Sequence, residues 1–151
     1  MTQALFKQIL TSQIPIAWIA GVRLESFDKN QVQTYVEFDF LNQNPFQSMF
    51  WAVQGMAAEF SGGMMLLNKV QESGANISTL VVHQESTFTK KAVGKIVFTC
   101  SDGELMDEKI KEAIETQEGV TFQVSSVGTD EEGDVVAKFL FTWSIKARSK
   151  G

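Results

Sequence analysis

Two segments of the chain alternate apolar and polar side chains with a period of two residues. The first runs from Val32 to Phe40 and places Val, Thr, Val, Phe and Phe on one face. The second runs from Val135 to Lys146 and is the longer of the two. A period of two is typical of a strand in an antiparallel sheet that is buried on one face only. We therefore predict a half-buried strand in each segment.

A third segment, from Ser48 to about Val70, predicts a long helix whose apolar residues cover nearly its whole circumference. Such a helix is expected to be buried on nearly all sides. Ser48 precedes the apolar run and is the expected N-cap. The run is long enough to cross a bilayer, but Gln54 and the Glu59 carboxylate near its centre would be costly there. We therefore predict a buried helix and no membrane span.

The remaining elements are shorter and are separated by turns. They comprise an N-terminal amphipathic helix, an extended segment over Ile14–Phe27 that follows the break at Pro15, strands over Thr79–Phe88, Lys95–Ser101 and Val120–Val127, and a charged surface helix over Glu104–Thr116. Neighbouring strands joined by tight turns are expected to pair antiparallel. The order therefore predicts an α+β fold in which a curved antiparallel sheet wraps around one long central helix. No glycine-rich nucleotide-binding motif accompanies these elements.

Length, composition and charge narrow the possible classes of function. The 151 residues have the size of one domain, predicted over residues 1–151, and the 44% hydrophobic content supplies a sizeable core. The net charge of −5 does not suit binding to nucleic acid or to an anionic membrane. Cys100 is the single cysteine and the N-terminus lacks a signal-peptide pattern, so we expect a cytoplasmic protein. No cluster of His, Cys and carboxylate residues has ligand spacing, so we predict no metal site.

The segment NPFQSMFWAVQGMAAEFSGG, from Asn44 to Gly63, resembles the central helix of hot-dog fold acyl-CoA thioesterases of the phenylacetyl-CoA and hydroxybenzoyl-CoA thioesterase group. That group carries an Asn, a His-Gly-Gly six residues later, and an Asp or Glu nine residues after the His. Asn44, Phe50 and Glu59 keep this spacing, but Phe-Trp-Ala replaces His-Gly-Gly. The sequence is therefore most similar to a poorly characterised branch that keeps only the Asn and the acid.

This resemblance, which extends from about Ile14 to Lys146, implies hydrolysis of an apolar acyl thioester, aliphatic or aryl. The acyl group would be carried by CoA or an acyl carrier protein, with no separate cofactor. Glu59 would activate water or attack the thioester carbonyl, because burial of a carboxyl raises its pKa and suits it to act as a base. The alternative is a structural carboxylate paired with a backbone amide or an arginine at a subunit interface.

Two further residues complete the implied catalytic set. The backbone amide of Trp51, at the start of the helix, would stabilise the oxyanion, because the first helical turn offers unsatisfied N–H groups. Asn44 would orient the water or the carbonyl through its side-chain amide. An Asn before Pro often caps a turn instead, and this second interpretation stays open.

The same comparison suggests contacts for the substrate. Phe50, Met49 and Met56 are candidates for the acyl group, and Lys90 and Lys91 for the phosphates of CoA. The alternative for the three apolar residues is packing in the core, and the alternative for the two lysines is an ordinary solvated turn. The resemblance also implies a homodimer or homotetramer with sites between subunits. The loss of His-Gly-Gly leaves a second function open, namely a non-catalytic acyl- or lipid-binding module on the same fold.

Overall fold

The computed structural model describes residues 1–149; residues 150 and 151 of the predicted domain lie outside this part. Six strands form one antiparallel sheet in the order β1-β2-β4-β5-β6-β3. The strands are β1 Arg23–Phe27, β2 Val32–Glu37, β3 Ile77–Phe88, β4 Lys95–Cys100, β5 Val120–Thr129 and β6 Val135–Ala147. The helices are α1 Gln3–Gln13, α2 Pro15–Ala20, α3 Trp51–Ser73 and α4 Gly103–Thr116, with a short 3-10 helix, η1, over Phe40–Asn42. The predicted α+β fold is confirmed.

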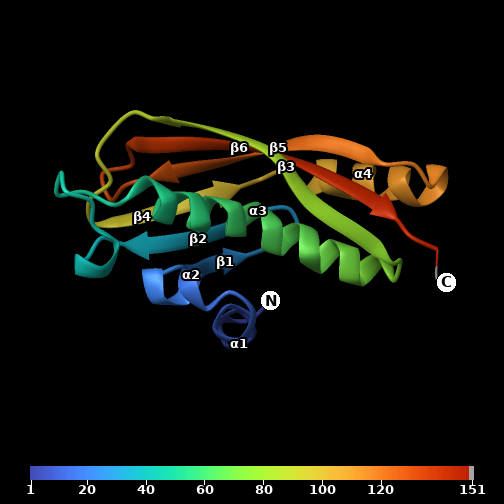
Figure 1. The fold of residues 1–151 in the computed structure, drawn as a ribbon, viewed down its shortest axis with the longest axis horizontal. Helices are drawn as coiled ribbons and strands as arrows, with labels where there is room; N and C mark the ends of the chain where they lie inside the picture. The colour runs from blue at the N-terminus through green and yellow to red at the C-terminus, as the bar shows by residue number, and fades with distance from the viewer. Residues whose placement is uncertain (150–151) are drawn as a thin grey trace.

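Helix α3 lies along the inner face of the curved sheet and forms the centre of the core (Figure 1). Small residues allow the helix to approach the strands closely. A Cβ atom on Gly62 would lie 3.4 Å from both Cys100 Sγ and Val124 Cγ2. A Cβ atom on Gly55 would lie 3.5 Å from the ring of Phe139 in β6. None of the helices within residues 1–149 combines the length and apolar character needed to cross a membrane.

Strand β3 forms one edge of the sheet and pairs only with β6 (Figure 1). It is 12 residues long, and most of its side chains are exposed. Leu80 and Val82 are 63% and 50% exposed. A long edge strand with exposed apolar side chains is a template for pairing with a further strand. The free side of β3 is therefore the part of the sheet best suited to join a second chain.

The structure corrects the prediction for the segment after Pro15. Pro15 begins helix α2 instead of starting an extended segment. Proline is favoured in the first turn of a helix because its missing N–H has no intrahelical partner there. Helix α2 ends at Ala20, and the next residue, Gly21, caps it with a φ of 106°, which suits glycine. The extended chain begins only with β1.

Two other boundaries differ from the prediction. Strand β2 ends at Glu37, because Asp39 accepts a hydrogen bond from the N–H of Leu41 and caps η1. Phe40 is consequently 80% exposed, although the alternating pattern places it on the buried face. Ser48 is not the N-cap of α3. Phe50 occupies that position and provides no side-chain hydrogen bond to the helix.

Candidate active site

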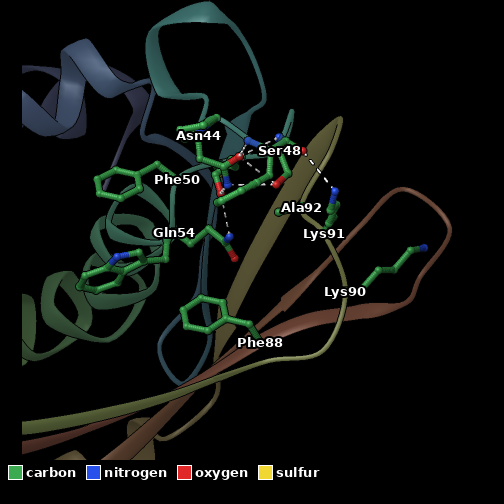
Figure 2. A pocket seen from close by; sticks show the side chains of 12 residues that line it. Asn44, Ser48, Phe50, Gln54, Phe88, Lys90, Lys91 and Ala92 are labelled. Atoms are coloured by element: carbon green, nitrogen blue, oxygen red, sulfur yellow. Dashed lines mark hydrogen bonds between the residues drawn. The ribbon is translucent and has the colours of Figure 1, made fainter.

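A pocket of about 520 Å³ opens beside the start of α3 (Figure 2). Most of the predicted site residues line it, namely Asn44, Met49, Phe50, Trp51, Lys90 and Lys91. Phe46, Phe88 and Ala92 add further apolar surface. Met56 and Glu59 are not among the lining residues; Met56 packs against the core. A single chain therefore brings together the start of the helix, the preceding loop and the turn after β3, without the predicted acid.

The side chain of Asn44 organises the loop that leads into α3. Its Oδ1 accepts hydrogen bonds from the N–H groups of Phe46 at 2.8 Å and Ser48 at 3.2 Å. Its Nδ2 donates to Ser48 Oγ at 3.0 Å and to the carbonyl of Met49 at 3.4 Å. Both ends of the amide are thus engaged within the loop, as expected for a residue that caps a turn.

The first two N–H groups of α3 have no acceptor among residues 1–149. The N–H groups of Val53 and Gln54 bond to the carbonyl of Phe50, whereas those of Trp51 and Ala52 find no partner. Since no side chain caps the helix, the positive end of its dipole is left at the edge of the pocket. Trp51 is 52% exposed, and its ring meets that of Phe50 edge to face at a centroid distance of 6.0 Å.

Gln54 is a pocket residue that the sequence reasoning did not assign to the site. It lies in the first turn and a half of α3 and is only 4% exposed. Its Nε2 donates to the carbonyl of Met49 at 3.3 Å, the same oxygen that accepts from Asn44. Its Oε1 is buried and meets no donor among residues 1–149. A glutamine within an otherwise apolar run of the helix is the signal that could have identified it.

Glu59 lies eight positions after Trp51, about two turns along α3. This spacing corresponds to about 12 Å along a helix axis. A Cβ atom on Gly63 would lie 3.4 Å from Glu59 Oε1 and 3.5 Å from Trp143 Cζ2, so both side chains lie beside this glycine. Burial raises the pKa of Glu59 above its ordinary value of 4.5, and within residues 1–149 no neighbouring charge or hydrogen bond offsets this effect.

The raised pKa of Glu59 gives a prediction for stability. The unfolded carboxyl ionises near pH 4.5, whereas the folded one holds its proton to higher pH. The contribution of Glu59 to stability is therefore fully present below pH 4.5 and is lost as the pH rises through the folded pKa. We expect Glu59→Gln to be more stable than the wild type at neutral pH and similar to it near pH 4. Urea unfolding at both pH values, at one protein concentration, measures the difference.

The matched control for this measurement is Glu72→Gln, which makes the same chemical change at an exposed position of the same helix. The difference in stability between Glu72→Gln and the wild type should not change with pH in the way expected for Glu59→Gln. A Glu59→Gln protein less stable than the wild type at neutral pH would contradict the prediction. That result would support the alternative in which the carboxylate has a structural partner.

The two candidate phosphate-binding lysines differ in their surroundings. Lys90 forms ion pairs with Asp130, Glu132 and Asp134 at 2.7, 3.2 and 2.8 Å, and the hydrogen bonds to these carboxylates raise its pKa. Lys91 donates instead to the carbonyl of Phe46 at 3.2 Å. Figure 2 shows Lys90 directed away from the loop that carries Asn44. Of the two, Lys91 has its positive charge uncompensated by a carboxylate within residues 1–149.

Several solved structures share this fold. A probable thioesterase of unknown function from Pseudomonas aeruginosa has a TM-score of 0.85 and 21% identity, covering 98% of this chain and 97% of its own. A thioesterase from Haemophilus influenzae has a TM-score of 0.74 and 12% identity, covering 97% and 92%. The chain thus has the hot-dog fold found among thioesterases, as the sequence predicted.

A thioesterase from Staphylococcus aureus adds a detail about residue spacing. It has a TM-score of 0.62 and 11% identity, covering 83% of this chain and 93% of its own. It was solved with a glutamine replaced by alanine and also with a glutamate replaced by alanine, at positions 15 residues apart. Asn44 and Glu59 are also 15 residues apart.

Sequence comparison places the chain in a family. Curated protein sequences give no match. The family described as "Domain of unknown function (DUF4442)" matches residues 2–145, nearly the whole chain. The protein therefore belongs to the DUF4442 family.

Proposed function

We propose that this protein is a thioester hydrolase that acts on apolar acyl groups carried by CoA or an acyl carrier protein. The observation that carries the proposal is the uncapped start of α3, where the N–H groups of Trp51 and Ala52 lie at the edge of a largely apolar pocket. Two adjacent donors at the positive end of a helix suit an oxyanion. The thioesterases with the same fold support this assignment.

In the proposed reaction, the thioester carbonyl oxygen accepts hydrogen bonds from the start of α3. A water molecule attacks the carbonyl carbon and forms a C–O bond, while Glu59 takes one of its protons and the carbonyl π electrons move to the oxygen. The oxyanion then collapses and the C–S bond breaks. The leaving thiolate takes the proton from Glu59, so the products are a free acid and a thiol. A largely buried carboxyl with a raised pKa is suited to this role.

The distance between the proposed groups supports a site built from two chains. Trp51 and Glu59 of one chain are about 12 Å apart along α3, which is too far for both to act on one carbonyl. We therefore propose that the acid comes from a second copy. The 15-residue spacing of the two substituted positions in the S. aureus thioesterase, equal to that of Asn44 and Glu59, supports a role for this pair in the site.

The free edge of β3 is the proposed contact between the two copies. We expect a homodimer, or a homotetramer built from two dimers, with a mass two or four times the 16.8 kDa of one chain. Replacing Leu80 and Val82 together by lysine places like charges close together across a two-fold axis and is expected to give monomers. Sedimentation at micromolar concentration measures the mass.

The control for the dimer prediction is Val93→Lys, which adds one lysine at a site that is as exposed as Val82, at 50%, but lies outside β3. It should leave the mass unchanged. A wild-type protein that sediments as a single 16.8 kDa species would contradict the two-chain site.

The pocket residues support an apolar acyl group. Met49, Phe50 and Phe88 provide its apolar surface, and we propose that the first two contact the acyl chain. Lys91 is the better candidate for a phosphate of CoA, because a phosphate at Lys90 would have to compete with three carboxylates. Asn44 supports the site by holding the loop before α3, through the hydrogen bonds described above.

The test of the proposed function is release of free thiol from an aliphatic and an aryl substrate, octanoyl-CoA and phenylacetyl-CoA. Hydrolysis above the uncatalysed rate is the expected result. Binding of either acyl-CoA without hydrolysis would favour the non-catalytic acyl-binding module instead. Neither binding nor hydrolysis across a wider panel of acyl chains would overturn the proposal.

A further inference from the structure

The pocket has one buried hydrogen-bond acceptor that the fold leaves unused. Gln54 is 4% exposed, and its Oε1 has no donor among residues 1–149. Leaving a buried acceptor unpaired is energetically costly, and native proteins keep few of them. An oxygen of this kind at the wall of a pocket therefore points to a ligand that donates a hydrogen bond.

The orientation of the Gln54 amide is set by the loop before α3. Its Nε2 donates to the carbonyl of Met49 at 3.3 Å, and the opposite orientation would place two acceptor oxygens against each other. Figure 2 shows the nitrogen facing the loop and the oxygen directed away from it, toward the side where Phe88 lies. The Met49 carbonyl also receives the Asn44 amide, so one loop oxygen holds both side chains. Asn44 has both ends of its amide engaged, whereas Gln54 keeps one end available.

The position of Gln54 relates this acceptor to the reacting carbonyl. Gln54 lies three residues after Trp51, so the two share one face of α3, and side chains at this spacing are about 5–6 Å apart at Cβ. An acceptor cannot stabilise an oxyanion, because the two negative oxygens repel. An acceptor can instead bind, through a hydrogen bond, the nucleophile that approaches the carbonyl carbon. Because the oxygen is buried, a donor as small as water suits this position better than a bulky one does.

We propose that Gln54 Oε1 accepts a hydrogen bond from the attacking water and orients it toward the thioester carbonyl. This inference rests on the proposed thioesterase function. The water then has two partners, one for each of its hydrogens. One hydrogen is bound by Gln54 of the chain that supplies the oxyanion donors. The other passes as a proton to Glu59 of the second chain as the C–O bond forms. Gln54 itself neither gains nor loses a proton.

The experiment replaces Gln54 by methionine, which has a similar length and no comparable acceptor. For octanoyl-CoA we expect kcat to fall about 10- to 100-fold, the rate equivalent of one lost hydrogen bond, with KM within twofold of the wild type. The same fall is expected for S-ethyl octanethioate, which carries the thioester but no amide group. Gln71→Met, at an exposed position on the same helix, should change neither constant.

The two substrates distinguish a water bound to Gln54 Oε1 from the other donor that this oxygen could bind, an amide N–H of CoA. If Gln54 bound an amide N–H of the pantetheine arm, the variant would raise KM for octanoyl-CoA and leave turnover of the ethyl thioester unchanged. That result would overturn the assignment, as would unchanged kinetics with both substrates. Gln54→Leu provides a second variant without the acceptor, and thermal unfolding verifies that each protein is folded. A wild type that hydrolyses neither these two thioesters nor any acyl-CoA of the wider panel would instead overturn the proposed function, and this assignment with it.

Discussion

Glu59→Gln is expected to lower the hydrolysis of octanoyl-CoA and phenylacetyl-CoA at least ~10²-fold, the typical contribution of a general base. Glutamine keeps the size and hydrogen-bonding reach of the side chain but cannot accept the proton of water. Glu59→Ala would be less informative because it also leaves a cavity beside Gly63 and Trp143. Thiol release measures turnover, and binding of the acyl-CoA to the variant is measured separately.

The outcome distinguishes the two functions considered for this fold. A folded Glu59→Gln protein that binds acyl-CoA but scarcely hydrolyses it is the result expected of an enzyme. Glu72→Gln on the same helix should behave as the wild type does. Turnover that survives in Glu59→Gln would remove Glu59 from the mechanism and leave the fold assignment unaffected. An acyl-binding module would show negligible turnover in the wild type and the same affinity in both proteins.

The regular elements could be predicted from the sequence because their patterns are local. The alternation in β6 and the apolar circumference of α3 each reflect which faces are buried. The errors lie where one residue type serves two purposes. Pro15 suits both the end of a helix and the first turn of the next. The alternation that continues to Phe40 has no structural meaning beyond Glu37, because the Asp39 cap turns the chain there.

The pocket was harder to predict because the state of its side chains depends on contacts that the hydrophobic pattern does not encode. Lys90 looks like a free cation in the sequence, but its carboxylate partners lie 40 or more residues later in the acidic turn between β5 and β6. Ser48 looks like a helix cap, but Asn44 engages it four residues earlier. Gln54 becomes notable only when the Met49 carbonyl is seen to fix one end of its amide. Spacing along the helix indicates none of these contacts.

Trp51→Pro is expected to lower turnover by about 10²- to 10³-fold, as does the loss of one oxyanion-hole donor in other enzymes. The backbone tolerates this change. Trp51 is the first residue of α3, where proline is favoured, and Phe50 has φ −60° and ψ 133°, which suits a residue before proline. Trp51→Ala is the matched control, because it removes the same ring and keeps the N–H. A fall of equal size in both variants would assign the effect to the ring instead of the donor.

Mixing the two impaired proteins, Trp51→Pro and Glu59→Gln, is expected to restore activity. If each site combines the start of α3 from one chain with Glu59 from the other, a mixed dimer has one intact site and one with both defects. Random exchange of subunits makes half of the dimers mixed, so activity should return to about a quarter of the wild-type level. Refolding the two variants together from urea provides the exchange, and each variant refolded alone is the control. If both groups instead act within one chain, every chain in the mixture carries a defective site and the mixture stays as inactive as its components.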